Sequence, residues 1–131
     1  MLGKLLLAVA VLSISTLVTV AISSAHQSQP PSETIGKIPL PFYTSHVKSV
    51  DRQSAGSVLI KTTDSKDTVV TWYKSHLKDQ AADHDTSNGH HIFTTHSGPT
   101  VDVSAVDARF GDGTTRIGLV WNAEKYGEYP K

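Results

Sequence analysis

The stretch SVLIKTTDSKDTVVTWYKSHLKD, residues 57–79, decides the fold because a strand pattern in it passes directly into a helix pattern. Residues 57–62 are rich in β-branched and aliphatic side chains, which predicts a strand. Downstream, apolar side chains recur at helical spacing and form one stripe with an aromatic ring on either side. The stripe is Val69, Val70, Tyr73 and Leu77, flanked by Trp72 and His76. We therefore expect one amphipathic helix packed on a flat surface.

The start of this helix carries a capping signal. Asp64 can accept a hydrogen bond from the first helical turn, and Asp67, three residues on, can reach back as in a capping box. Both carboxylates also favour the positive end of the helix dipole. The sequence thus predicts a helix that is capped by Asp64 and runs to Asp79.

Strands are expected on both sides of the helix. Upstream, 47–50 and 57–62 form a hairpin across the turn-rich residues 52–56. Downstream, strands at 90–96, 100–107 and 114–122 are separated by Gly-containing turns. In the last strand, one face carries Thr115, Ile117, Leu119 and Trp121. Short turns make these three strands antiparallel neighbours.

The expected fold is α+β: an antiparallel four- to five-stranded sheet with one amphipathic helix on one face, in the order β-β-α-β-β-β. The α+β domain is expected to span residues 43–123, followed by a C-terminal tail at 124–131. Residues 81–89 are expected to form a solvated loop between the helix and the next strand.

The chain resembles small exported bacterial α+β domains of unknown function. The likeness covers about residues 43–121 and rests on structural motifs: Thr63, Asp64 and Ser65 at the cap, Trp72, Tyr73, Lys74 and Leu77 in the helix, and Gly113, Thr114, Arg116 and Ile117 at the last strand. The resemblance implies the fold and export, and it implies no particular activity.

Composition narrows the function classes. The chain has 131 residues, equal numbers of basic and acidic side chains (12 each) and no cysteine. This length predicts one domain. Zero net charge is not typical of nucleic-acid-binding proteins, so no nucleic-acid partner is expected. The lack of cysteine excludes disulfides and thiol chemistry.

The N-terminus predicts export. In residues 1–25, one positive charge at Lys4 precedes an apolar run, and the small residues at 23–25 suit cleavage after Ala25. This pattern indicates a signal peptide and a periplasmic or extracellular protein. The alternative is an uncleaved membrane anchor, which would be the chain's only contact with a membrane. Residues 26–42 are Pro-rich and predict a spacer, whose apolar end at 38–43 could pack along the domain edge.

A cluster of histidines and aspartates suggests a zinc or copper site. Imidazole and carboxylate groups suit these metals when three or four converge. The candidate ligands are Asp83, His84, Asp85, His90 and His91. The alternative interpretation is a solvated polar loop.

No motif fixes a catalytic nucleophile, and Asp102 and Asp107 would lie on opposite faces of a strand. The aromatic residues Trp72, Tyr126 and Tyr129 are candidates for contact with an envelope protein. The sequence therefore favours an exported, non-enzymatic binding or accessory domain. The alternatives are a metal-binding envelope protein that uses residues 83–96 and a small hydrolase with an unrecognised site.

Overall fold

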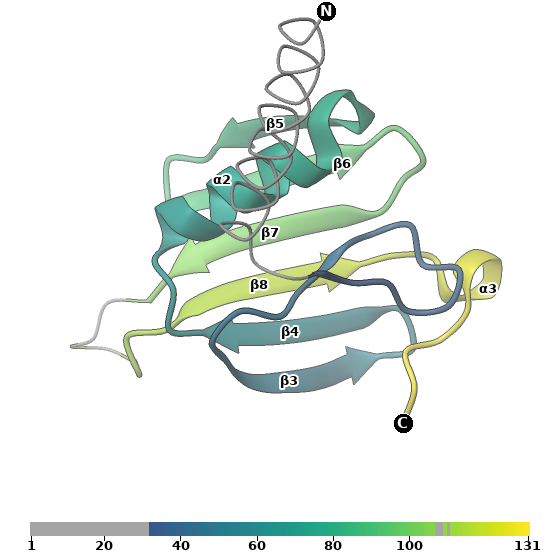
Figure 1. Ribbon diagram of the computed structural model, residues 1–131, viewed down its shortest axis with the longest axis horizontal. Helices are drawn as coiled ribbons and strands as arrows, with labels where there is room; N and C mark the ends of the chain where they lie inside the picture. Colours follow the sequence, from purple (N-terminus) through teal and green to yellow (C-terminus); the bar gives the residue numbers. More distant parts are fainter. Residues whose placement is uncertain (1–31, 107–108, 110) are drawn as a thin grey trace, which may run out of the picture. The chain divides into compact units, whose positions relative to one another are not determined.

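Six antiparallel strands form one sheet, which is the framework of the domain (Figure 1). The computed structural model describes residues 32–106, 109 and 111–131, so the predicted leader at 1–25 lies outside the described residues. In space the strands follow the order β3-β4-β8-β7-β6-β5. Their bounds are β3 Val47–Ser54, β4 Ser57–Thr62, β5 Ala81–Asp85, β6 His90–Thr95, β7 Thr100–Ala105 and β8 Thr115–Val120.

The α+β class and the antiparallel arrangement agree with the prediction, but the sheet has more strands than the four or five expected. The additional strand is β5, in the segment that we expected to be a solvated loop. It pairs with β6 from Ala81 opposite Thr95 to Asp85 opposite His91. Most of its side chains are exposed, so it shows no apolar alternation by which a sequence pattern could reveal it.

Helix α2, Lys66–Leu77, follows β4 as expected, and its buried residues are Val69, Trp72, Tyr73 and Leu77. The predicted cap was wrong by one residue. Ser65 is the N-cap, and its Oγ accepts a hydrogen bond from the amide of Thr68 at 3.2 Å. Asp64 instead bonds Tyr43 and His46. The helix ends at Leu77, and a 3-10 turn, η1 (Lys78–Gln80), leads into β5.

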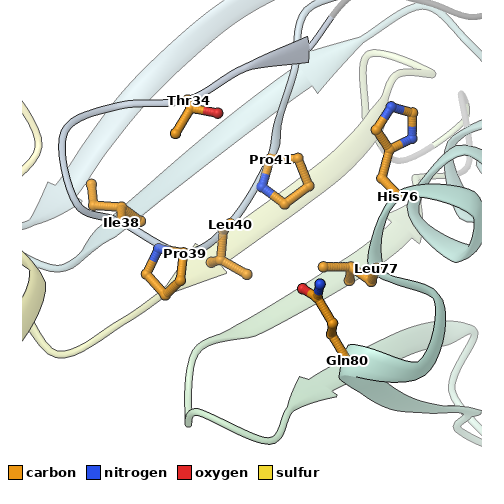
Figure 2. Close-up of a pocket in the computed structure, with 8 residues that line it drawn as sticks. All are labelled: Thr34, Ile38, Pro39, Leu40, Pro41, His76, Leu77 and Gln80. Atoms are coloured by element: carbon orange, nitrogen blue, oxygen red, sulfur yellow. The ribbon is translucent and has the colours of Figure 1, made fainter.

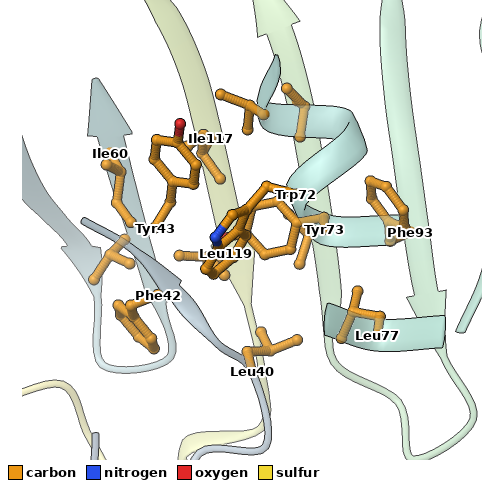
Figure 3. Close-up of a cluster of buried hydrophobic side chains, with 14 of the residues drawn as sticks. Leu40, Phe42, Tyr43, Ile60, Trp72, Tyr73, Leu77, Phe93, Ile117 and Leu119 are labelled. Carbon is orange, nitrogen blue, oxygen red and sulfur yellow. The ribbon is translucent and has the colours of Figure 1, made fainter. Parts of the chain in front are cut away.

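Two segments cover the same face of the sheet and enclose the core. In Figure 1, α2 lies over β6 and β7, while the chain that contains β1 (Ser32–Glu33) and β2 (Phe42–Tyr43) lies over β8 and β4. Figure 3 shows their side chains meeting those of the strands. The upstream segment contributes Ile38, Leu40, Phe42 and Tyr43 to the core. Part of the stretch predicted to be a spacer is therefore packed inside the domain.

The C-terminal residues also pack on this core. Helix α3 (Ala123–Tyr126) follows β8, and the indole Nε1 of Trp121 donates a hydrogen bond to the carbonyl of Gly127 at 2.8 Å. The ring of Tyr129 stacks on Phe42 with 5.8 Å between centroids. Among the described residues, no helix has the length and apolarity needed to cross a membrane.

Candidate functional site

The sheet face opposite α2 carries no covering element from the described part of the chain (Figure 1). Because directly paired residues point to the same side of a sheet, the strand register arranges this surface in three rows. The upper row is Ser57, Val120, Thr100, Thr94 and Ala82. The middle row is Asp51, Leu59, Gly118, Asp102, Ile92 and His84. The lower row is Ser49, Lys61, Arg116, Ser104 and His90. We call these three rows the open face.

The open face mixes apolar side chains with charges. Val120 is a large hydrophobic residue, and 51% of its surface is exposed to solvent. Leu59 and Ile92 are half-buried. Two close contacts involve its polar groups: Lys61 Nζ lies 3.8 Å from Asp112 Oδ2, and His90 Nδ1 lies 2.8 Å from Asp102 Oδ1. The Nε of Arg116 is buried and has no hydrogen-bond partner among the described residues.

One end of the open face is hollowed. A cavity of about 430 Å³ lies between the β6–β7 turn and α3, and its lining includes Thr100 and Val120 of the open face. The hydroxyl of Tyr126, a predicted partner-binding residue, donates to the carbonyl of Ser97 at 3.3 Å across this hollow. Lys125 Nζ lies 5.1 Å from the centroid of the Tyr126 ring. The lining of the hollow therefore combines apolar and polar residues and includes the cation of Lys125.

The structure does not gather the five predicted metal ligands into one site. Asp83, Asp85 and His91 lie on the side of the sheet that faces α2, whereas His84 and His90 lie on the open face. Among the described residues, no group of three or more His, Cys, Asp or Glu is arranged to hold a metal ion. Zinc or copper binding stays a prediction.

His91 is instead held between two carboxylates. Its Nδ1 lies 2.7 Å from Asp85 Oδ1, and its Nε2 lies 2.7 Å from Asp83 Oδ2. Both ring nitrogens, the atoms through which a histidine binds a metal, are occupied by these contacts. The hydrogen bond from His91 is the main cause that holds the pKa of Asp85 below its usual value.

Two helix lysines extend this cluster. Lys66 Nζ lies 3.8 Å from Asp85, and Lys74 Nζ lies 3.7 Å from Asp83. Both lysines, Asp85 and His91 line a polar hollow of about 300 Å³. Because each contact joins β5 to either α2 or β6, the cluster attaches the edge strand to the rest of the domain.

Sequence reasoning missed a second polar cluster, at the start of α2. Asp64 accepts hydrogen bonds from the hydroxyl of Tyr43 and, at 2.8 Å, from Nδ1 of His46. Burial raises the pKa of Asp64, but the bonds from Tyr43, Ser45 and His46 outweigh it and hold the pKa below its usual value. Burial and the neighbouring carboxylate raise the pKa of Tyr43. The sequence points to this cluster only through the expected hairpin, whose open end brings residue 46 close to residue 63.

This second cluster lacks the geometry of a Ser-His-Asp triad. Ser45 Oγ lies 3.1 Å from the same ring nitrogen of His46 that binds Asp64. A serine nucleophile would have to contact the other nitrogen, Nε2. Thr62 Oγ1 donates to the carbonyls of Ser45 and His46 at 2.8 and 3.1 Å, which holds His46 at a φ of +49°. The arrangement ties the loop before β3 to the start of α2.

The other two predicted partner-binding residues differ in exposure. Trp72 is only 4% exposed and packs edge-on against Tyr43 and Tyr73 and stacks on His76, so it belongs to the core. Tyr129 is half-buried against Phe42. Of the three aromatics, only Tyr126 lines the hollow at the end of the open face.

A further shallow groove lies on the α2 side of the molecule. Figure 2 shows it between the Pro-containing segment and the end of α2, lined by Ile38, Pro39, Leu40, Pro41 and Leu77 with polar groups at its rim. Its volume is about 280 Å³. The hydroxyl of Tyr73 donates to the carbonyl of Pro41 at 3.0 Å and fixes one wall. Most of its apolar lining is core side chains seen from outside.

Comparison with protein-family models, with curated protein sequences and with solved structures gives no match.

Proposed function

We propose that this protein is an exported, non-catalytic binding domain that docks an envelope protein on its open face. The observation that carries the proposal is the exposure of Val120 on this face, beside the half-buried Leu59 and next to a hollow. Apolar side chains surrounded by polar ones are typical of protein interfaces. The predicted leader supports export to the compartment where such a partner would be met.

The edges of the sheet are less suited to binding than its face. Strand β3 departs from regular pairing at two places, between Val47 and Ser49 and between Arg52 and Ser54. Strand β5 is short, and charged or polar side chains fill its outer part. Bulges, shortness and charge all oppose the addition of another strand. The open face is therefore the favoured surface.

A substitution at the centre of the open face tests the proposal. An added Cβ at Gly118 would be 3.9 Å from its nearest neighbours, so Gly118→Arg introduces a long cation without a backbone clash. The matched control is Thr71→Arg, which adds the same side chain at an exposed position of α2. Immobilised wild-type and variant proteins are incubated with envelope extract, and the captured proteins are identified by mass spectrometry.

We expect the wild type and Thr71→Arg to capture the same protein and Gly118→Arg to lose it. Equal capture by all three proteins would show that binding does not use the open face. Circular dichroism of both variants checks that the sheet and the helix are intact.

A further inference from the structure

We propose that the protein bound by the open face is a second copy of this chain, related by a two-fold axis that runs parallel to the strands between β8 and β7. This inference rests on the proposed function and names its partner. A two-fold interface must be self-complementary, because each residue meets the symmetry-related surface. The three rows of the open face allow this condition to be examined residue by residue.

The proposed axis places β8 over β7 of the second copy, β4 over β6 and β3 over β5. In the middle row, Leu59 then faces Ile92 of the second copy, and Asp51 faces His84. In the upper row, Val120 faces Thr100. Apolar side chains thus meet apolar or methyl-bearing ones, and a carboxylate meets an imidazole.

Under this axis Arg116 of one copy and Asp102 of the other are complementary in charge, whereas Lys61 faces His90 of the second copy. Asp102 of the second copy lies over Gly118, where the lack of a side chain leaves room for it. Arg116 is one row away on the same strand as Gly118, within reach of that carboxylate. The guanidinium therefore gains an anionic neighbour from the second copy. The symmetry makes this pair occur twice.

The other in-plane axis, perpendicular to the strands, gives poor contacts. It places each middle-row residue over its own copy, so that Asp51 meets Asp51 and Asp102 meets Asp102. It also puts Val120 opposite Arg116. Like charges that face each other destabilise an interface. The register therefore favours the axis parallel to the strands.

The size of the open face predicts a weak dimer. Six strands about 4.8 Å apart and five residues long give about 500 Å² per copy, or about 1,000 Å² in total. That total is near the lower limit of about 1,000 Å² for specific interfaces. We expect a reversible dimer that dissociates on dilution.

A charge swap between two chains tests this arrangement. Arg116→Glu brings two carboxylates together at each Arg116–Asp102 contact, and Asp102→Arg brings two cations together there, so each variant alone should dissociate. When the two variants are mixed, every such contact again joins opposite charges. Sedimentation equilibrium of the purified proteins over a range of concentrations measures the dissociation constants, with Thr71→Arg as the control.

We expect each charge-reversed variant to raise the dissociation constant by roughly tenfold or more, and the mixture to restore wild-type association. Restoration also shows that both variants are folded. A wild-type chain that stays monomeric, or variants that associate as well as the wild type, would overturn the dimer. If the chain is monomeric and Gly118→Arg still abolishes capture of another protein, the dimer is overturned and the proposed binding function stands.

Discussion

At the scale of single residues, Gly56 lies where the backbone of the β3–β4 turn closely approaches the backbone after β8. A Cβ at this position would lie 2.2 Å from the carbonyl oxygen of Trp121, and the Gly56 carbonyl accepts a hydrogen bond from the Trp121 amide at 2.8 Å. The hairpin between β3 and β4 can contact the end of β8 only because residue 56 has no side chain.

We therefore expect Gly56→Ala to lower the free energy of unfolding by about 2 kcal/mol, since the backbone must move to relieve the clash. Gly118→Ala is the matched control, because its Cβ would meet nothing closer than 3.9 Å. That control should change stability by no more than about 0.5 kcal/mol. Urea denaturation followed by tryptophan fluorescence measures both values, and equal effects of the two substitutions would refute the proposed contact.

Asp64 makes stability depend on pH. Its hydrogen bonds from Tyr43 and His46 hold the pKa below its unfolded value, so the carboxylate stabilises the folded state. This contribution is complete above the unfolded pKa, near 4, and is lost as the pH falls through the lower folded pKa. We expect Asp64→Asn to be less stable than the wild type at neutral pH and to lose less stability on acidification.

Asp67→Asn is the control for this prediction, since Asp67 is exposed at the start of the same helix. Thermal unfolding of the three proteins between about pH 3 and pH 7 covers the titration of ordinary carboxyl groups. If Asp64→Asn and Asp67→Asn follow the same curve, the cluster around Asp64 is not a source of stability.

At the scale of elements, the edge strand β5 differs from the central strand β4 in how it is held. Its side chains make ionic contacts with His91, Lys66 and Lys74, and none of its residues is buried. By contrast, β4 buries every second side chain. An edge strand without apolar anchoring opens more easily than the centre of a sheet.

We expect amide hydrogen exchange in residues 81–85 to accelerate, relative to intrinsic rates, as the pH falls below the usual carboxyl range near 4. The hydrogen bond from His91 lowers the pKa of Asp85, and protonation of the Asp85 carboxylate at low pH removes this bond. The strand then loses one of the contacts that hold it. Asp83→Asn combined with Asp85→Asn should abolish this pH dependence. Residues of β4 serve as the internal reference, and equal protection of β4 and β5 at every pH would contradict the prediction.

The elements that sequence reasoning found are those with apolar periodicity. The stripe on α2 and the alternation in β8 each identified a buried face, because burial itself selects the pattern. Strand β5 was not predicted because its exposed polar and charged side chains show no apolar alternation, although it forms a local hairpin with β6. Prolines dominate the pattern up to residue 42 and predict a spacer, although the aliphatic and aromatic residues between the last prolines are buried.

The polar clusters were less predictable than the fold. Asp83, Asp85 and His91, three of the five candidate metal ligands, lie together, but the pleat of the strands sends His84 and His90 to the other face. The bond between His46 and Asp64 joins residues 18 positions apart and depends on the loop that Thr62 holds. No local pattern specifies such a contact.

At the scale of the whole molecule, the segment of residues 32–43 is a structural part of the domain. Four of its side chains, Ile38, Leu40, Phe42 and Tyr43, are at most 3% exposed. Burial of each contributes about 1.5–3 kcal/mol, and the four together are comparable to the net stability of about 5–15 kcal/mol of a typical domain.

We expect a chain that begins at residue 44 to lose cooperative unfolding and near-ultraviolet circular dichroism, because its core would be open to water. A chain that begins at residue 32 retains the segment and should unfold cooperatively. If a chain that begins at residue 44 is stable and unfolds cooperatively, residues 32–43 are not needed for folding and the prediction is wrong.

Site-specific photocrosslinking in the producing cells shows whether the open face is the binding surface. A photoreactive amino acid replaces Val120 or Thr94 on the open face, or Thr71 on the solvent side of α2, three exposed positions. We expect a discrete crosslinked protein, a second copy under the dimer proposal, from Val120 and Thr94 and none from Thr71. Crosslinks from Thr71 alone, or from no position, would contradict this expectation.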